Sequence, residues 1–247
     1  MSNMNVTDKR PSLSIVVLAY KAGESIVQFL TVLKNDLKTA GIDDFQIILV
    51  ANYHVTDPSD QTANIAHNLA RADPRIKVIA EAKMGMMGWD ARMGLVAADG
   101  ESIALIDGDG QMPPEDIVRG YKVMANGEVD FVKTYRASRE DGIYRLISSK
   151  AFNLLFRILF PRSRFRDINS KPKLLTRSAL EKMNLSCDGW FLDGEIIIEA
   201  LRLQLRYIEI PTVFQENEWR GSFVKFSTIF EMIFSLIKYR FKKLKSL

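Results

Sequence analysis

Two aspartates separated by one glycine, Asp107 and Asp109, are the side chains in this sequence best suited to hold a metal ion. They follow an apolar run, residues 102–106, that reads as a buried strand, and open α/β sheets bind ligands at the carboxyl ends of their strands. A glycine follows each aspartate, so the backbone can turn and bring both carboxylates onto one hard cation such as Mg²⁺ or Mn²⁺. Gln111 could add an oxygen, and the ion could bridge the chain to a diphosphate.

Other interpretations fit the same residues. An Asp-Gly pair after a strand is also a common turn that binds nothing. The loop of phosphatases that use an aspartate as nucleophile has an Asp-x-Asp pattern too. That loop normally follows the first strand of its fold and carries Thr or Val where Gln111 stands, so the sequence disfavours it.

Two basic stretches are set into an otherwise acidic chain. Residues 136–173 hold ten Lys and Arg against three acidic residues, and residues 220–247 hold seven against one, although the net charge of the chain is only +4. This asymmetry indicates an anionic partner, which could be nucleic acid, anionic lipid or a phosphorylated substrate. The aromatic residues of both stretches fall on apolar helix faces and not in a basic groove, so nucleic acid is not the expected partner.

Alternating strands and helices must position these residues in the first half of the chain. Apolar runs without polar alternation, each followed by a helical pattern, predict an α/β fold with a mostly parallel sheet covered by helices on both faces. The expected strands are residues 14–19, 46–51, 77–80, 102–107 and 130–135. The expected helices of this half are residues 24–38, 60–70 and 88–98, and one that opens at Pro113-Pro114.

The second half has a different pattern. It predicts helices over 143–160 and 191–203, a strand over 206–210 closed by Pro211, and a tail helix over 222–244. The first and last of these helices combine a wide apolar face with Lys and Arg, which is typical of helices that lie in a membrane interface. Packing in the core or in a dimer would also fit that pattern.

Composition excludes several classes of protein. The 247 residues are 47% hydrophobic and 26% charged, which suits one globular domain with a small appendage. No apolar run is long enough for a polytopic membrane protein, and the single cysteine, Cys187, excludes a disulfide framework. The polar first dozen residues predict no secretory signal, so we expect the chain in the cytoplasm or peripheral on the inner face of a membrane.

Several blocks, taken in order over residues 12–226, resemble the family 2 glycosyltransferases of the GT-A fold. Within them they resemble the dolichyl-phosphate mannose synthase-like, polyprenyl-phosphate branch. Residues 13–20 with Glu24 are similar to the family's first strand and its P-x-Y-N-E loop. Residues 107–115 are similar to its D-A-D-x-Q-H-P-P-E signature, and residues 166–177 to its D-x-x-S-G-F-(K/R)-x-x-x-R block. Glu209-Ile-Pro211 followed by Arg220-Gly-Ser222 resembles its final block.

The resemblance implies a Rossmann-like GT-A sheet and a nucleoside-diphosphate sugar as donor. It implies that the diphosphate of the donor lies on Mg²⁺ or Mn²⁺, and that Asp107 and Asp109 hold this ion with help from Gln111. The residues expected at the donor are Ala19, Tyr20, Glu24, Asp60 and Gly85.

In this branch the acceptor is a polyprenyl phosphate, dolichyl or undecaprenyl phosphate, whose own phosphate oxygen attacks the sugar and inverts its anomeric centre. Such a phosphate is already anionic near neutral pH and needs little help from a base. The residues aligned with the expected phosphate ligands are Arg136, Arg145, Ser149 and Arg220. The alternative acceptor is a sugar hydroxyl of a lipid-linked or surface glycan, for which we expect Asp193 to act as the catalytic base.

The sequence also departs from the family pattern. The family has a D-D-G-S stretch after its second strand, where this chain reads Val50-Ala-Asn-Tyr-His54. Lys171-Pro172 replaces the usual Gly-Phe. A non-catalytic, membrane-binding GT-A-like module is therefore a further alternative, and oligomerisation is left open.

We expect two parts along the chain. A GT-A glycosyltransferase domain would cover residues 10–220, with an amphipathic interface helix inserted at 143–165. Residues 221–247 would form a basic amphipathic helix at the membrane interface.

Overall fold

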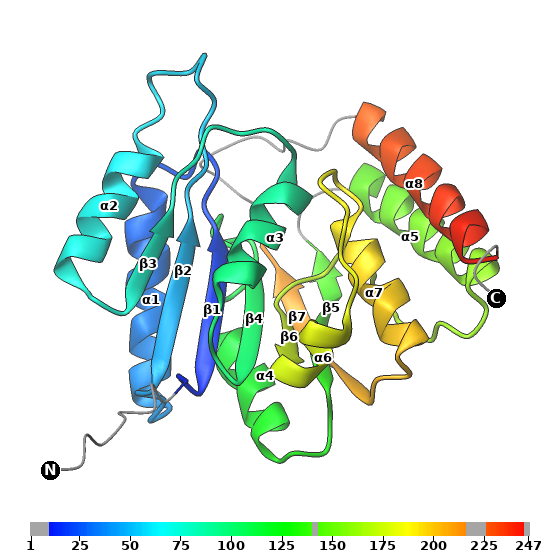
Figure 1. The fold of residues 1–247 in the computed structure, drawn as a ribbon. Helices are drawn as coiled ribbons and strands as arrows, with labels where there is room; N and C mark the ends of the chain where they lie inside the picture. The colour runs from blue at the N-terminus through cyan, green and yellow to red at the C-terminus, as the bar shows by residue number, and fades with distance from the viewer. Residues whose placement is uncertain (1–9, 140–142, 216–225, 245–247) are drawn as a thin grey trace, which may run out of the picture.

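The computed structural model describes residues 10–139, 143–215 and 226–244, and Figure 1 shows a central sheet with helices on both faces. The strands are β1 (Leu13–Leu18), β2 (Phe45–Val50), β3 (Ile76–Ile79), β4 (Ser102–Asp107), β5 (Phe131–Arg139), β6 (Lys173–Thr176) and β7 (Tyr207–Phe214). The helices are α1 (Ser25–Thr39), α2 (Thr62–Ala72), α3 (Met87–Ala97), α4 (Glu115–Ala125), α5 (Ile143–Leu159), α6 (Arg177–Lys182), α7 (Leu192–Arg202) and α8 (Phe226–Leu244).

The sheet has seven strands in the order β3-β2-β1-β4-β6-β5-β7. Every neighbouring pair is parallel except the two that involve β6, which runs antiparallel to both β4 and β5. The predicted α/β class and mostly parallel sheet are therefore confirmed. Because β6 is reversed, its first residues lie at the edge of the sheet where β1 and β4 end.

Continuous apolar runs form the central strands because both faces of the sheet are covered. All six residues of β1 and all six of β2 are buried. Alternate residues of β1 point to opposite faces: Ile15 and Val17 join the core under α1 and α4, whereas Val16 and Leu18 join the core under α3 and α7.

Two features of the sheet differ from the sequence prediction. Strand β6 and the short helix α6 were not predicted, because β6 has only four residues and begins at a buried lysine, Lys173. The prediction that Pro211 closes the last strand is wrong, since β7 continues to Phe214 with Pro211 opposite Tyr135. Strand β7 ends the sheet order, and an edge strand tolerates a residue that lacks an N–H.

Helices α5 and α8 lie side by side, next to α7, at the end of the sheet formed by β5 and β7 (Figure 1). Each is anchored by one buried stripe, which includes Phe152 and Phe156 of α5 and Leu236 of α8. The helices also expose apolar side chains on their outer faces, which are Ile147, Leu154 and Ile158 of α5 and Phe230, Phe234, Ile237 and Phe241 of α8. Among the described residues, no helix has both the length and the hydropathy required to cross a bilayer.

Candidate active site

The loop after β4 has a tightly fixed backbone. Asp107 ends the strand, and the backbone N–H of Gly108 donates to the carbonyl oxygen of Leu18 at 2.8 Å. A Cβ at position 108 would lie 2.8 Å from the Ile26 side chain and 2.9 Å from the Val17 side chain, so any larger residue there would have to displace both. Gly110 has a φ of +75°, the left-handed region that favours glycine. These constraints place the side chains of Asp107 and Asp109 at the carboxyl edge of the sheet.

The remaining two predicted metal ligands differ in their contacts. Asp109 accepts a hydrogen bond from the backbone N–H of Gln111 at 3.1 Å, which closes the turn. The side-chain amide of Gln111 donates to the carbonyl oxygen of Gln215 at 3.3 Å, and the backbone of Gln215 donates back to Gln111 at 2.9 Å. Gln111 thus ties this loop to the segment that follows β7.

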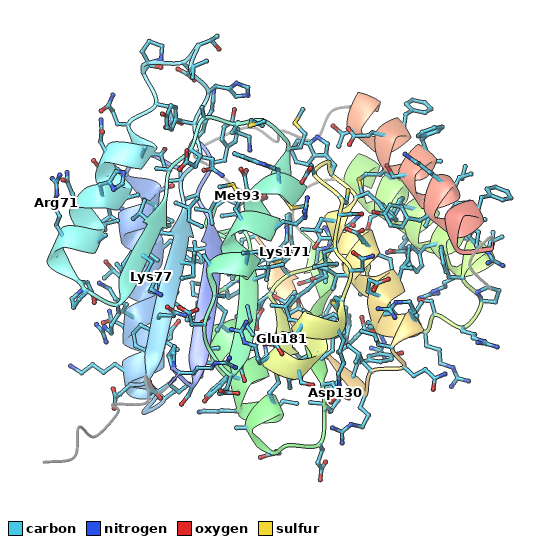
Figure 2. The ribbon with its side chains drawn as sticks, viewed as in Figure 1. Arg71, Lys77, Met93, Asp130, Lys171 and Glu181 are labelled. Carbon is cyan, nitrogen blue, oxygen red and sulfur yellow. The ribbon has the colours of Figure 1, made fainter. Side chains whose placement is uncertain are left out.

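Lys171 contacts the first aspartate of the pair. Its Nζ lies 3.0 Å from each carboxylate oxygen of Asp107 and 3.2 Å from Oδ2 of Asp193. The lysine is buried near the middle of the molecule (Figure 2). Burial disfavours the charged ammonium, but Asp107 and Asp193 outweigh this effect and raise the pKa of Lys171 above its ordinary value.

Asp193 lies in the first turn of α7 and is also buried. It contacts Lys173 at 2.5 Å as well as Lys171. Burial raises the pKa of Asp193, but the two lysines outweigh that effect and lower it below its ordinary value. The pKa of Lys173 is lowered to about 8, mainly because the side chain is removed from water. Asp193 is therefore a stably ionised member of a buried charge cluster.

Two of the residues predicted to bind the acceptor phosphate lie together. The guanidinium of Arg136 holds both carboxylate oxygens of Asp167, at 2.6 and 2.7 Å, and its Nη2 lies 3.5 Å from Oγ of Ser149 on α5. The Nζ of Lys133 lies 3.2 Å from Glu209 on the neighbouring strand. The side chain of Arg145 and the whole of Arg220 fall outside the described part of the structure.

The residues predicted at the donor lie around the ends of β1 and β2. Ala19 is buried, with its N–H donating to Val50 at 2.8 Å, and Glu24 is exposed at the start of α1. The Lys83 ammonium lies over the ring of Tyr20, 4.6 Å from the ring centroid, in a cation–π contact. Asp60 accepts hydrogen bonds from Thr62, whose hydroxyl accepts from the Gly23 N–H at 2.9 Å. The loop after β1 is thus connected to the start of α2.

Gly85 has a structural reason to be glycine. A Cβ there would lie 2.5 Å from Trp89 and 3.1 Å from the carbonyl oxygen of Asp188. The same loop is joined to the 187–189 segment by backbone hydrogen bonds from Met86 to Asp188 and from Gly88 to Gly189, at 2.8 and 2.9 Å. This contact fastens the start of α3 to the segment that leads into α7.

An acidic group is present near the end of β2 although the acidic stretch of the family is missing. Asn52 donates to the carboxylate of Asp90 at 2.8 Å, and Lys83 forms an ion pair with the same carboxylate. Asp90 comes from α3, so the charge is supplied by a different element. Burial raises the pKa of Asp90, although Lys83 and Asn52 oppose that effect.

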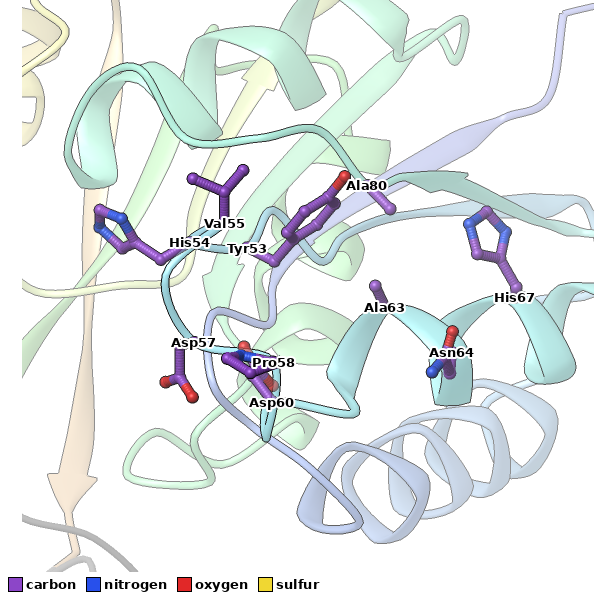
Figure 3. Close-up of a pocket in the computed structure, with 10 residues that line it drawn as sticks. All are labelled: Tyr53, His54, Val55, Asp57, Pro58, Asp60, Ala63, Asn64, His67 and Ala80. Carbon is purple, nitrogen blue, oxygen red and sulfur yellow. The ribbon is translucent and has the colours of Figure 1, made fainter.

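A cavity of about 370 Å³ opens between the loop after β2 and helix α2. Figure 3 shows the polar side chains around it, which include Tyr53, His54, Asp57, Asp60, Asn64 and His67. One carboxylate oxygen of Asp60, Oδ2, is buried and has no hydrogen-bond partner in the part of the chain that the structure describes. The cavity therefore adjoins one of the predicted donor residues.

The donor set at the sheet edge suits a hard divalent ion shared with a substrate. Among the described residues, no group of three or more His, Cys, Asp and Glu side chains is placed to hold a metal ion. Two carboxylates and an amide oxygen are oxygen ligands of the kind that Mg²⁺ and Mn²⁺ prefer, and a bound diphosphate would supply the others. The residues present fit an ion that binds together with a diphosphate.

Sequence reasoning missed the lysines of the charge cluster. Lys171 stood out only as a replacement in a family motif, and Lys173 belongs to a strand that was not predicted. Lys133 is fully buried inside the apolar run of β5. Two signals in the sequence could have indicated a buried ion-pair network: a lysine within an otherwise apolar run, and a Lys-Pro-Lys triplet further along the chain.

The family model and the curated relatives that match this chain all point to glycosyltransferases. The model of glycosyl transferase family 2 matches residues 14–183. An undecaprenyl-phosphate 4-deoxy-4-formamido-L-arabinose transferase of Pectobacterium carotovorum is 27% identical over 93% of this chain and 68% of its own length. A dolichyl-phosphate beta-glucosyltransferase of Trichomonas vaginalis is 26% identical over 92% of this chain and 72% of its own length.

Solved structures share the fold at lower identity. A mannosyltransferase of Pyrobaculum calidifontis, in complex with GDP-Man and Mn²⁺, superposes with a TM-score of 0.58 and 17% identity over 87% of this chain and 59% of its own chain. The glucosyl-3-phosphoglycerate synthase of Mycobacterium tuberculosis, in complex with Mn²⁺, UDP and glucosyl-3-phosphoglycerate, gives a TM-score of 0.66 and 16% identity over 93% of this chain and 80% of its own. These similarities establish a GT-A type of fold.

Proposed function

Because this chain belongs to glycosyl transferase family 2, we propose that it transfers a sugar from a nucleoside-diphosphate sugar to a polyprenyl phosphate at a membrane surface. One observation carries the proposal: Asp107 and Asp109 lie at the carboxyl edge of β4, and Arg136 and Ser149 meet beyond the neighbouring strand β6. The polyprenyl-phosphate transferases among its relatives support this choice of acceptor.

The proposed reaction is a single displacement. An oxygen of the acceptor phosphate attacks the anomeric carbon of the sugar, and the bond from that carbon to the diphosphate oxygen breaks. The electron pair leaves with the nucleoside diphosphate, and attack from the opposite side inverts the anomeric centre. No proton has to be removed from the nucleophile, because a phosphate monoester is ionised near neutral pH.

The aspartates serve the leaving group in this scheme. Asp107 and Asp109, with Gln111 nearby, would hold a Mg²⁺ or Mn²⁺ ion, which supplies positive charge that stabilises the departing diphosphate. The fixed turn around Gly108 and Gly110 keeps both carboxylates in place before the donor binds. Such preorganised electrostatics is usually the largest contribution to catalysis of this kind.

Arg136 is preorganised for an anionic acceptor. Asp167 holds its guanidinium from one side with two hydrogen bonds, so the side chain keeps one orientation toward Ser149. Arginine at fixed geometry suits a phosphate, which accepts paired hydrogen bonds from its planar fork. Arg145 and Arg220 remain proposed as further phosphate ligands.

The charge state of Asp193 favours the lipid phosphate over a sugar hydroxyl. A hydroxyl acceptor needs a general base, and an effective base has a pKa near the working pH. Asp193 is buried between Lys171 and Lys173, which lower its pKa below the ordinary value of a carboxyl. It is therefore a weak base, whereas a phosphate acceptor requires none.

We propose that α5 and α8 bring the active site to the membrane. Their exposed apolar side chains include Leu154 and Ile158 on α5 and Phe230 and Phe234 on α8. The four-residue spacing within each pair puts both members on one side of their helix. Each helix also packs into the same core as the sheet, which joins this apolar surface to the domain that carries the site.

A transfer assay tests the proposed function. Purified protein is incubated with polyprenyl phosphate in detergent and with radiolabelled UDP-, GDP- or dTDP-sugars, with and without Mn²⁺. We expect labelled lipid that mild acid hydrolyses, and a loss of about a hundredfold or more with Asp109→Ala. Asp99→Ala is the matched control, since Asp99 pairs with Lys77 on the surface. Full transfer by the Asp109→Ala variant, or label that resists mild acid, would contradict the proposal.

A binding measurement separates an enzyme from a non-catalytic module. Thermal melting with UDP, GDP or dTDP, each with and without Mn²⁺, detects a bound nucleotide because a ligand of the native state stabilises it. We expect a metal-dependent rise in Tm with one of the three. No rise with any of them would favour the module.

A further inference from the structure

Lys171 presents a fixed positive charge to one of the two carboxylates proposed to hold the metal ion. Its Nζ lies 3.0 Å from each of the two carboxylate oxygens of Asp107, so both oxygens share the positive charge. The lysine side chain is only 4% exposed, whereas Asp107 is 35% exposed. The ammonium therefore approaches Asp107 from inside the protein, and solvent approaches it from outside.

The fold fixes this contact. Strand β6 pairs with β4 in antiparallel register, with Lys173 opposite Leu105. Asp107 lies two residues after Leu105 and Lys171 two residues before Lys173, so the antiparallel direction brings both to the same end of the strand pair. Asp193 holds the same ammonium from α7 at 3.2 Å. Two anchors on different elements leave little freedom for the lysine to move away.

The charge of Asp107 is already offset from inside the protein. Two ammonium groups, of Lys171 and Lys173, meet two carboxylates, of Asp107 and Asp193, within 3.2 Å. A divalent ion that approaches Asp107 therefore meets a carboxylate with a positive charge directly behind it. Repulsion between two cations at such distances is large wherever water is partly excluded.

We propose that Lys171 is the internal counterion of Asp107 and competes with the divalent ion for that carboxylate, so that the protein alone binds the bare ion weakly. The donor diphosphate then supplies the negative charge that Lys171 removes from the site. Lys171 is a positioning residue in this scheme, because it acts through Asp107. The inference extends the proposed function, since that function assigns the metal ion to Asp107 and Asp109.

Binding of Mn²⁺ alone tests this competition without any transfer assay. Free Mn²⁺ is measured by its electron paramagnetic resonance signal during titration of the wild type, Lys171→Met and Lys171→Gln. We expect both variants to bind Mn²⁺ about tenfold more tightly than the wild type, because a positive charge next to the ligand is gone. The glutamine side chain can still donate hydrogen bonds to the surrounding carboxylates. Lys171→Gln therefore tests the inference even if the Lys171→Met variant does not fold.

Three controls locate the effect. Lys171→Arg keeps the charge and should bind Mn²⁺ like the wild type. Lys77→Met removes an exposed lysine paired with Asp99 and should change nothing. Adding Asp107→Asn to Lys171→Met should return the affinity to that of the wild type. Circular dichroism and thermal melting establish that each variant is folded.

Equal Mn²⁺ affinity of the wild type and both uncharged variants overturns the inference, and so does a gain that persists after Asp107→Asn. Neither result bears on whether sugar is transferred. Conversely, the protein could transfer no sugar from any donor and still gain Mn²⁺ affinity through Lys171→Met. That result would contradict the proposed function and support Lys171 as the internal counterion.

Discussion

Arg136 and Arg206 make the same paired contact with an aspartate in different surroundings. Arg136 holds both oxygens of Asp167 with only 9% of its side chain exposed. Arg206 holds both oxygens of Asp130, at 3.0 and 3.1 Å, with 61% exposed. The pair offers a matched test of what the buried arginine does.

We expect Arg136→Lys to weaken the use of polyprenyl phosphate. Lysine is a point charge and cannot bond Asp167 and a phosphate with the fixed fork of arginine. The KM for polyprenyl phosphate should rise about tenfold, which corresponds to about 1.4 kcal/mol. The matched Arg206→Lys variant should leave this KM within about twofold, because an exposed pair contributes little. Equal effects of the two substitutions would contradict a phosphate-binding role for Arg136.

Asp167 makes the stability of the protein sensitive to acid. Its carboxyl is buried, which raises the pKa, but Arg136 and Lys133 outweigh this effect and lower the pKa below the ordinary 3.8. The folded state thus favours the ionised form more than the unfolded chain does. This stabilisation is complete above the ordinary pKa and is lost as the pH falls below it.

The Asp167→Asn variant should therefore show a flatter dependence of Tm on pH than the wild type between about pH 5 and pH 3. At neutral pH the variant should be less stable by about 3 kcal/mol, since Arg136 loses its buried partner charge. Thermal melts across the pH range measure both effects. Lys77 also lowers the pKa of Asp99, but at an exposed ion pair, so Asp99→Asn should flatten the slope much less than Asp167→Asn does. An equally steep slope in Asp167→Asn and the wild type would contradict the assignment.

At the scale of elements, the start of α3 is interlocked with the segment before α7. Gly88 donates its N–H to the carbonyl oxygen of Gly189, and a Cβ at Gly88 would lie 2.4 Å from the carbonyl oxygen of Cys187. On the far side, the same segment is held by α8, where Glu231 accepts from the Trp190 N–H at 3.2 Å. Three helices thus converge on one short loop.

We expect Gly88→Ala to destabilise the fold by about 1–3 kcal/mol, because the new methyl group meets backbone that cannot move aside. Gly120→Ala is the matched comparison, since its nearest contact is the end of the Leu174 side chain at 2.7 Å, which can rotate. Urea unfolding of both variants measures the difference. A loss at Gly120 as large as that at Gly88 would show that the interlocked loop is not special.

At the scale of the whole molecule, one side gathers exposed apolar and basic residues. Figure 1 shows α5 and α8 together at this side, where Phe230, Phe234 and Phe241 of α8 are each at least 60% exposed. Exposed basic residues lie on the same two helices and after α5, and they are Lys150, Arg157, Arg162, Arg164 and Lys238. This combination suits the surface of an anionic membrane.

Phe234→Asp should reduce binding to vesicles of phosphatidylcholine with about one third phosphatidylglycerol by roughly tenfold. The substitution removes buried apolar area in the bilayer and adds a charge that anionic lipid repels. Val96→Asp is the matched control, because Val96 is 87% exposed on α3. Co-sedimentation measures binding, and equal losses for both variants would argue against α8 as the docking element.

The sequence predicted the parts of the fold that local patterns encode. Central strands such as β1 and β2 are nearly continuous apolar runs, so their positions could be predicted from the local sequence alone. Strand β6 was not predicted because it begins with a buried lysine whose charge is balanced by Asp193, twenty residues further along the chain. Buried charge gives no periodic signal until its partner is known.

The same limit holds for the candidate site. Asp107 and Asp109 could be placed at a sheet edge because they directly follow a strand. Their meeting with Lys171 depends on the reversed direction of β6, which no local pattern indicates. Asp193 was predicted only as a base for a hydroxyl acceptor, and its burial between two lysines becomes evident only when α7 packs on the sheet.

The reversed strand β6 has a consequence for how such a fold can diversify. In a parallel sheet the loops at the ligand edge all leave the carboxyl ends of strands, whereas β6 delivers to that edge a residue that precedes its own strand. Position 171 can thus change from small to charged while β4 and its aspartates stay untouched. A substitution at this one position can therefore change the net charge next to the aspartates without altering the strands that hold them.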